Sequence, residues 1–217
     1  MAAQKTVKRG NVMACIIFGA GSYYGMERRP EPGDYIIAAD GGWQYCKQEG
    51  IVPDLLLGDF DSLAVVPDFA HIHRVPVEKD DSDMMLAIKD GLAHGQREFH
   101  LYGGMGGARS DHTLANMQSL LYLTCHGARG WLYGDRERYT VIRDGSSITF
   151  PAKEQGIMSV FCMGADAEGV SITGAQYPLS DAALSAEFPL GVSNHFIGNP
   201  VTVSVRSGSL LIGLLDK

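Results

Sequence analysis

The stretch Val12-Met13-Ala14-Cys15-Ile16-Ile17-Phe18 decides how the first part of the chain folds, and it leads straight into Gly19-Ala20-Gly21. Lys5, Lys8 and Arg9 precede it, so the segment superficially resembles a signal peptide. The apolar run is short, however, and it passes directly into the glycines, which favours a buried strand. We therefore expect residues 12–18 to form the first strand of a sheet.

Further short apolar runs follow this strand, and helix-like stretches separate them. The expected strands cover residues 35–39, 71–75, 98–102 and 130–133, and the expected helices cover residues 42–49, 82–94 and 111–124. Continuous apolar strands separated by amphipathic helices predict a mostly parallel sheet with helices on both faces, an α/β/α domain. Right-handed crossovers then place all the strand-to-helix loops at one edge of the sheet.

The pattern changes near residue 146, where short strands with turn residues between them replace the alternation. We expect strands at residues 147–150, 157–163, 169–173, 201–205 and 209–215, the last two joined as a hairpin through Ser207-Gly208. Residues 181–186 have a weak helical pattern. The predicted fold class is α/β, with an N-terminal mostly parallel sheet domain at residues 11–144 and a C-terminal antiparallel β-sandwich at residues 145–217.

The composition is that of an ordinary globular protein, with 45% hydrophobic and 20% charged residues among 217. The net charge of −7 argues against a nucleic-acid partner, which usually requires a basic face. The four cysteines include no CxxC pair, so neither a disulfide scaffold nor a zinc site is expected, and a cytoplasmic location is favoured. No apolar stretch reaches the roughly 18 residues of a membrane span, so no membrane partner is expected.

A pair of aspartates follows the apolar triplet Leu55-Leu56-Leu57, in the segment Gly58-Asp59-Phe60-Asp61-Ser62. Residues two apart in an extended segment point the same way, roughly 7 Å apart, so Asp59 and Asp61 can present two carboxylates on one side. Two such charges repel each other unless a cation lies beside them, and magnesium prefers hard oxygen ligands. An isolated pair of this kind is more often a solvated acidic turn, so the pair alone decides little.

A second acidic loop, Glu78-Lys79-Asp80-Asp81-Ser82-Asp83, follows the next expected strand. Asp80, Asp81 or Ser82 can cap the helix that begins there, and acids in its first turn favour the positive end of the helix dipole. Capping is sufficient to explain most of these residues. The loop opens at the same sheet edge as the first aspartate pair, however, and three or four acids converging there exceed what capping requires. Metal binding is therefore the better interpretation.

A glycine-rich loop, Gly103-Gly104-Met105-Gly106-Gly107-Ala108-Arg109-Ser110-Asp111, leads into the last expected helix. Glycines after a strand let backbone amides approach a ligand, and a helix start favours anions. The loop lacks the Gly-Lys-Ser/Thr of a P-loop, and it can equally be a tight crossover. Arg109 favours a phosphate site, because a guanidinium can neutralise phosphate in a fork geometry. Asp111 can cap the helix, or approach a metal ion or an acceptor hydroxyl.

Together, the three loops supply cation ligands, backbone donors and an arginine at one sheet edge. Catalysis of phosphoryl-group transfer depends mostly on positioning and charge stabilisation, and these groups provide both. The sequence therefore predicts a magnesium-dependent enzyme that transfers a phosphate-containing group from a nucleotide to a small acceptor.

The order of these motifs resembles the thiamine pyrophosphokinase (thiamine diphosphokinase) family. The matching segments are Ala39-Asp40-Gly41-Gly42, Gly58-Asp59-Phe60-Asp61-Ser62, Lys79-Asp80-Asp81-Ser82-Asp83, the glycine loop with Asp111-His112-Thr113-Leu114-Ala115-Asn116, Tyr177-Pro178-Leu179 and Gly191-Val192-Ser193-Asn194. One departure concerns the glycine loop. The family usually has Gly-Gly-Arg-x-Asp-His, whereas Ala108 stands here between Gly107 and Arg109, so the loop is expected to bulge or its glycine register to slip by one.

The resemblance implies an α/β nucleotide-binding domain, a β-sandwich, and a homodimer with active sites between the subunits. It also implies a reaction in which ATP and thiamine give AMP and thiamine diphosphate. The residues implied to act in catalysis are Asp59, Asp61 and Asp83 as Mg²⁺ ligands, with Arg109 and Asp111 beside the transferred diphosphate. The residues implied near ATP are Asp40, Gly41, Gly42, Asp80, Ser82, Gly104, Gly106 and Gly107. Ser193 and Asn194 would help to form the thiamine pocket.

Other functions stay compatible with the sequence. A diphosphokinase for another hydroxymethyl heterocycle, such as a pterin, would share the acidic loops and differ in the acceptor pocket, and the match at residues 191–194 favours thiamine. A nucleotide phosphatase would use water in place of the acceptor. A non-catalytic thiamine or nucleotide sensor would bind its ligand without turnover, and the complete set of acids argues against it.

Overall fold

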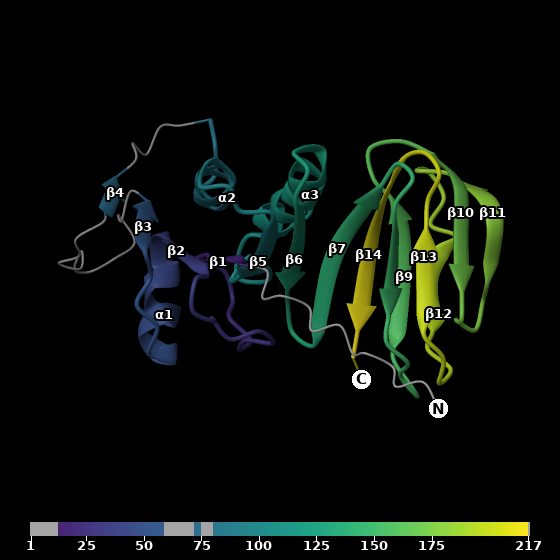
Figure 1. The fold of residues 1–217 in the computed structure, drawn as a ribbon, viewed down its shortest axis with the longest axis horizontal. Helices are drawn as coiled ribbons and strands as arrows, with labels where there is room; N and C mark the ends of the chain where they lie inside the picture. Colours follow the sequence, from purple (N-terminus) through teal and green to yellow (C-terminus); the bar gives the residue numbers. More distant parts are fainter. Residues whose placement is uncertain (1–12, 59–71, 75–79, 217) are drawn as a thin grey trace, which may run out of the picture.

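The computed structural model describes residues 13–58, 72–74 and 80–216 of the chain, and a parallel sheet forms its N-terminal half (Figure 1). The parallel strands are β1 (Cys15–Phe18), β2 (Tyr35–Ala39), β3 (Leu55–Gly58), β4 (Ile72–Arg74), β5 (Glu98–Tyr102) and β6 (Arg129–Tyr133). They lie in the order β6-β5-β1-β2-β3-β4, and each pairs in parallel with its neighbours in this set. All but β3 correspond to expected strands, and β3 contains the apolar triplet that precedes the first aspartate pair.

Helices cover both faces of this parallel sheet, as the sequence predicts. The helices are η1 (Asp40–Gly42), α1 (Trp43–Glu49), α2 (Asp83–Ala93) and α3 (Ser110–Cys125). Within β1, Ile16 packs into the core on the α1 side, whereas Ile17 packs into the core beneath α2 and α3. Burial on both faces explains why β1, β2 and β3 are apolar without alternation. No helix within the described residues is long and apolar enough to cross a membrane.

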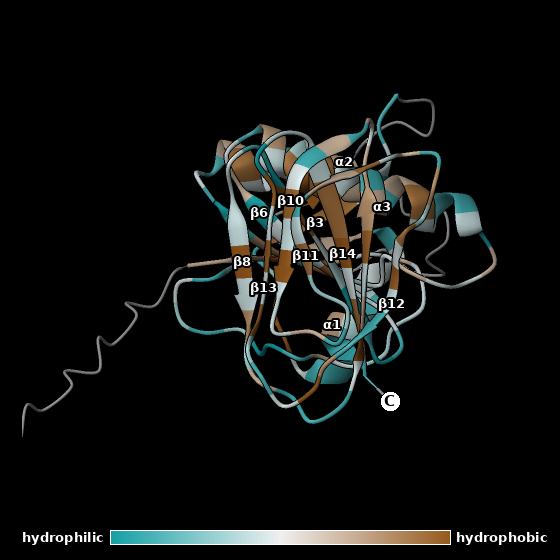
Figure 2. Ribbon diagram, turned by 90° about the vertical axis from the view of Figure 1, so that its right-hand side faces the viewer, coloured by the Kyte–Doolittle hydropathy of each residue, from teal (hydrophilic) through white to brown (hydrophobic). Residues whose placement is uncertain are grey.

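Antiparallel strands continue the same sheet beyond β6, and a second sheet packs on them. The strands that continue it are, outward from β6, β7 (Glu137–Arg143), β14 (Ser209–Leu215), β9 (Ile157–Cys162) and β12 (Gly191–His195). The second sheet consists of β11 (Leu179–Leu184), β10 (Ala167–Thr173), β13 (Val201–Ser204) and β8 (Ser147–Phe150), in this order. An apolar core lies between the two sheets, and brown apolar segments run along strands of both in Figure 2. The expected sandwich is present, but one of its layers belongs to the large mixed sheet.

The hairpin expected from residues 201–205 and 209–215 is wrong. Strand β13 pairs with β8 and β10, whereas β14 pairs with β7 and β9, so the two strands belong to different sheets. Val203 and Ile212 are both fully buried in the core between the sheets, one from each layer. An alternating pattern requires only one buried face, and two strands that face each other across a core satisfy it as well as two paired side by side.

The weak helix expected at residues 181–186 is also wrong, because most of this segment lies in β11. Ala182 and Leu184 pair with Val170 and Ala167 of β10, at the spacing of two residues that a strand requires. The register shifts along this pair, and such bulges weaken the alternation by which a strand is recognised in a sequence. Strands β7 and β12 also have no counterpart among the expected strands.

The predicted domain boundary near Asp144-Gly145 stays a prediction. Strand β7 ends at Arg143, just before this point, yet it pairs with β14 along residues 137–143 and 209–215. The two halves of the chain therefore share one continuous sheet.

The strand order changes direction between β1 and β5. The chain passes from β1 to β2 on one side of this point, and from β5 to β6 on the other. The loops that follow β1 and β5 therefore diverge, and such a switch point opens a crevice at the carboxyl ends of the strands.

Gly42 allows η1 and α1 to approach β1 closely, so a larger residue at this position is expected to destabilise the fold. A Cβ added at Gly42 would lie 1.9 Å from the carbonyl oxygen of Phe18, although the φ of −58° suits any residue. Gly42→Ala is therefore expected to lower the free energy of unfolding by about 1–3 kcal/mol, the usual range for overpacking. The neighbouring Gly41→Ala is the control, since its Cβ would meet only the Ala20 side chain, at 3.2 Å. Urea unfolding measures the free energy of unfolding of both variants, and an equal decrease in the two would contradict the steric explanation.

Candidate active site

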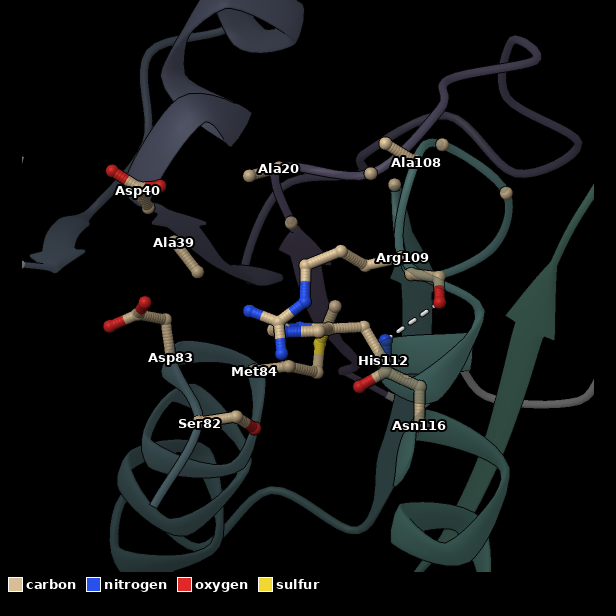
Figure 3. Close-up of a pocket in the computed structure, with 16 residues that line it drawn as sticks. Ala20, Ala39, Asp40, Ser82, Asp83, Met84, Ala108, Arg109, His112 and Asn116 are labelled. Carbon is tan, nitrogen blue, oxygen red and sulfur yellow. Dashed lines mark hydrogen bonds between the residues drawn. The ribbon is translucent and has the colours of Figure 1, made fainter. Parts of the chain in front are cut away.

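A cleft of about 280 Å³ lies at the switch point between β1 and β5. It is lined by the turn 19–21 after β1, by Ala39 at the end of β2 and the following Asp40, by the start of α2, by the glycine loop after β5, and by His112 and Asn116 of α3 (Figure 3). The structure thus brings together the end of the second acidic loop and the glycine loop, which the sequence places at one sheet edge.

The turns after β1 and β5 form one wall of the cleft and are hydrogen-bonded to each other. The Gly21 amide donates to the Gly103 carbonyl at 2.7 Å, and the Ser22 amide donates to the Met105 carbonyl at 3.1 Å. A Cβ on Gly103 would come within 2.3 Å of the Gly19 carbonyl oxygen. Only glycine permits this approach, because real Cβ contacts are never so short. The wall is therefore bare backbone, to which a ligand can come close.

Two side chains of helix α3 hydrogen-bond to the glycine loop and hold it in place. The buried side chain of Asn116 donates from Nδ2 to the Gly104 carbonyl at 2.7 Å, and Thr113 Oγ1 accepts the Gly106 amide at 3.2 Å. Gly106 and Gly107 both have positive φ, 69° and 83°, so the loop turns sharply just before Ala108, the extra residue from which a bulge was expected. Ala108 and Arg109 both still line the cleft.

Arg109 reaches into the cleft from the glycine loop, as Figure 3 shows. Its Nη2 lies 2.6 Å from Oδ2 of Asp111, and the two side chains are 69% and 63% exposed. The hydrogen bond from Arg109 lowers the pKa of Asp111. Asp111 itself does not line the cleft. Water screens an exposed pair of this kind, so a ligand anion can replace Asp111 as the partner of the guanidinium.

Two aspartates line the opposite wall. Asp40 follows β2 and Asp83 begins α2, and Figure 3 shows both carboxylates on the same side of the cleft. Asp40 has a φ of 49°, a left-handed conformation that is uncommon for residues with a side chain and frequent at functional sites. A Cβ on Gly58, the last residue of β3, would lie 3.1 Å from the Asp40 Cα. The strand that leads to the first aspartate pair therefore ends beside Asp40.

The polar residues at the start of α2 have different roles. Ser82 caps the helix, since its Oγ accepts the Met85 amide at 3.2 Å, and it also lines the cleft. Asp81 instead pairs with Lys89 at 2.6 Å on the helix surface. Asp80 is exposed and does not line the cleft. Of the three acids that the structure describes in this loop, Asp83 alone contributes to the cleft wall.

Asp59 and Asp61 lie outside the described residues, so their part in a metal site stays a prediction. Within the described ranges, no three His, Cys, Asp or Glu side chains are grouped to hold a metal ion. Asp40 and Asp83 offer carboxylate oxygens, the donors that Mg²⁺ prefers. The chemistry of this wall therefore fits the expected ion.

The residues implied for the thiamine pocket lie away from the cleft. Ser193 and Asn194 belong to β12, the edge strand of the large sheet, and β9, β14, β7 and β6 lie between β12 and β5 (Figure 1). Asn194 is buried: its Oδ1 accepts the amide of Tyr177 at 2.9 Å, and its Nδ2 donates to the Tyr177 carbonyl at 2.7 Å. Ser193 has a φ of 61° and donates its amide to Ser159 Oγ at 3.1 Å. Within one chain, neither residue contacts the cleft.

Some of the glycines predicted near ATP lie outside the cleft wall, and some cleft residues were not predicted. Gly41 and Gly42 do not line the cleft, whereas Gly104, Gly106 and Gly107 do. The turn 19–21 and Asn116 were not among the predicted site residues. The available signal for the turn was two glycines immediately after a buried strand, and Asn116 is buried one helical turn after His112.

Comparison with known proteins places both halves of the chain in one family. Residues 30–131 match the family model described as the catalytic domain of thiamin pyrophosphokinase, and residues 146–210 match the model of its vitamin B1 binding domain. The chain belongs to the thiamin pyrophosphokinase family. The expected resemblance is thereby confirmed, and the family's two models together span well over half of the chain.

Individual members of the family share this fold. The thiamine pyrophosphokinase of Bacillus subtilis (strain 168) is 25% identical over 182 residues, which cover 81% of this chain and 85% of that protein. The crystal structure of thiamine pyrophosphokinase from Bacillus subtilis superimposes with a TM-score of 0.83 at 23% identity, covering 94% of this chain and 99% of the other. The crystal structure of yeast thiamin pyrophosphokinase superimposes with a TM-score of 0.70 at 12% identity, covering 95% of this chain and 87% of the other. The α/β fold with a mixed sheet and an antiparallel sheet is common to them.

The hydrogen bond from Asn116 to the glycine loop is expected to stabilise the fold. Asn116→Ala leaves the Gly104 carbonyl without its buried donor, which is expected to lower the free energy of unfolding by about 1–3 kcal/mol. Asn116→Asp keeps the shape but turns an acceptor toward the carbonyl, so its loss should be larger. Gln118→Ala, at an exposed position of α3, is the control and should change stability by less than about 0.5 kcal/mol. Urea unfolding distinguishes them, and an Asn116→Asp variant as stable as the parent would contradict the proposed bond.

Proposed function

We propose that this chain is a magnesium-dependent thiamine diphosphokinase, which transfers a diphosphate group from ATP to thiamine and releases AMP. The observation that carries the proposal is the cleft at the switch point, where glycine backbone, an arginine and two aspartates face one another. Groups of this kind bind a nucleotide triphosphate together with a divalent cation.

The backbone wall and Arg109 would bind the phosphates. Glycines at positions 19, 21 and 103 keep bulky side chains out of this wall, so that phosphates can come close to the main chain, and the start of α3 adds the positive end of a helix. Asp111 already accepts hydrogen bonds from Nε and Nη2 of Arg109, and Arg109 would exchange this exposed partner for a phosphate, which carries more negative charge than one carboxylate.

The aspartate wall would hold Mg²⁺ through Asp83 and, as the sequence predicts, Asp59 and Asp61. A bound magnesium ion supplies positive charge to the phosphate oxygens and to the leaving group. Asp40 lies on the same wall and would face the nucleotide.

The proposed reaction is an in-line displacement. The hydroxyl oxygen of thiamine forms a bond to the β-phosphorus of ATP, the bond from this phosphorus to the α–β bridging oxygen breaks, and AMP retains that oxygen. The hydroxyl proton passes to solvent. Asp111 is a poor proton acceptor because Arg109 lowers its pKa, and a loose transition state requires little help from a base. We therefore assign Asp111 to orienting Arg109 before ATP binds.

A homodimer would complete the site. Ser193 and Asn194 lie on the edge strand β12, away from the cleft of their own chain, so a second copy would have to bring its β12 edge to it. Large apolar side chains are exposed near this edge, with Leu190 56% and Val192 44% exposed. Exposed apolar groups gathered in one region are typical of a surface that another protein covers.

Thiamine is the favoured acceptor because residues 146–210 match the model of the vitamin B1 binding domain. A pterin diphosphokinase would not require that match, and a non-catalytic sensor would not require acids in the cleft. One assay separates these functions: the chain is incubated with ATP, Mg²⁺ and thiamine. We expect AMP and thiamine diphosphate in equal amounts, whereas AMP formed without the thiamine product would overturn the proposal.

Asp83→Asn provides a test of the aspartate wall. The amide removes a negative charge from the cleft, so turnover should fall by about 100-fold or more, the effect of losing one charge-stabilising group in a site. Asp81→Asn is the matched control two residues earlier, because Asp81 pairs with Lys89 outside the cleft, and its turnover should stay within about twofold. Equal turnover of the two variants would remove Asp83 from the proposed site.

Val192→Asp tests the proposed dimer. A charge on the β12 edge should prevent dimer formation, so that analytical ultracentrifugation detects a monomer. Thiamine diphosphate formation should be lost. ATP binding should be retained, because the cleft belongs to one chain. Val52→Asp, at a position 76% exposed in the other half, is the control and should stay dimeric and active. An active monomer would contradict a site shared between subunits.

A further inference from the structure

The turn 19–21 has no side chain with which to anchor itself, since its residues are Gly, Ala and Gly. Two hydrogen bonds tie it to β5 and the glycine loop, from the Gly19 amide to the Tyr102 carbonyl at 2.8 Å and from the Gly21 amide to the Gly103 carbonyl at 2.7 Å. These bonds fix the inner side of the turn. Its outer side faces helix α1, which does not line the cleft.

Tyr45 of α1 reaches this outer side. Its hydroxyl donates to the Gly21 carbonyl at 2.6 Å, a short hydrogen bond between residues 24 apart in the chain. The amide of the same peptide unit, that of Ser22, donates to the Met105 carbonyl at 3.1 Å. Both polar ends of the Gly21–Ser22 peptide are therefore held, and its plane cannot rotate. Glycine at position 21 makes this bracing necessary, because glycine allows the most backbone rotation of any residue.

The ring of Tyr45 is itself held in place. It stacks on the ring of Tyr23, with 4.8 Å between centroids and 20° between planes, and the Tyr23 hydroxyl donates to Glu49 Oε1 at 2.8 Å. Tyr23 thus stabilises the position of Tyr45 without touching the turn through its own hydroxyl. The two tyrosines form one stacked pair in which a single hydroxyl acts on the cleft wall.

We propose that Tyr45 is a positioning residue for the nucleotide: it holds the turn 19–21 in the conformation that receives ATP. The inference rests on the proposed function, since it assigns this wall to the nucleotide. Without the hydroxyl, the turn would sample several conformations, and ATP would have to select one of them, which weakens binding. In the proposed site the acceptor would be bound through the β12 residues Ser193 and Asn194 and not through this turn, so its affinity should not change.

Tyr45→Phe and Tyr23→Phe test the proposal as a matched pair. Each variant removes one hydroxyl from the same stacked pair and keeps both rings. ATP binding in the presence of Mg²⁺ is measured by calorimetry, and KM for ATP, KM for thiamine and kcat are measured by product formation. Tyr45→Phe should weaken ATP binding and raise KM for ATP about 3–10-fold, the equivalent of one hydrogen bond, with KM for thiamine and kcat within about twofold. Tyr23→Phe should leave all four values within about twofold.

A direct readout of the turn accompanies the binding data. Amide hydrogen exchange of Ser22 without ligand should be faster in Tyr45→Phe than in Tyr23→Phe, because only the first variant releases the Gly21–Ser22 peptide. Equal ATP affinity of the two variants, or equal exchange at Ser22, would overturn the positioning role. A parent chain that binds ATP but makes no thiamine diphosphate would refute the proposed function and leave this inference testable by binding alone. A parent chain that binds no ATP would refute both.

Discussion

The close approach of two backbone turns, after β1 and after β5, is the constraint on which the site depends. Gly19 and Gly103 come so near that a methyl group on Gly103 would lie 2.3 Å from the Gly19 carbonyl oxygen. The approach exists because β1 and β5 are adjacent parallel strands whose chains then leave in opposite directions. Divergence opens the crevice, and the absence of side chains on these glycines leaves main-chain groups at its wall. Arg109 and Asp83 then face this wall only because their own elements, the glycine loop and α2, begin at the same edge.

The parallel half could be predicted from the sequence because central strands such as β1 and β2 are buried on both faces. A segment such as Tyr35–Ala39 is apolar throughout, and the helices between such segments leave only a parallel sheet as an arrangement. The sandwich half was harder, because its strands alternate. Alternation fixes which face of β13 is buried and says nothing about its partner, so Val201–Ser204 was paired with the wrong strand. Pairing there is decided by packing between residues distant in the sequence, such as Val203 and Ile212, which belong to the same core.

The candidate site could be predicted where motif residues follow strands directly, and not where they act from elsewhere in the fold. Arg109, Ser82 and Asp83 were expected from their loops, and all three line the cleft. Asn116 and Tyr45 support the glycine turns from helices α3 and α1, and nothing in their local sequence distinguishes them from packing residues. Their roles arise only when the helices are placed on opposite faces of the sheet.

The continuous sheet also constrains how the acceptor can reach the nucleotide. Strands β7 and β14 pair along their full lengths, and β14 pairs with β9 over six of its residues, so the sandwich cannot swing toward the cleft without breaking many hydrogen bonds. At the usual spacing of strands, β12 lies roughly 24 Å from β5 along the sheet. Hinge closure within one chain is thus a poor way to bring Ser193 and Asn194 to the phosphates. A second copy, meeting the first through the exposed β12 edge, could do so without distorting either sheet. Because the continuous sheet joins the two halves of one chain rigidly, it favours a site that is shared between two subunits.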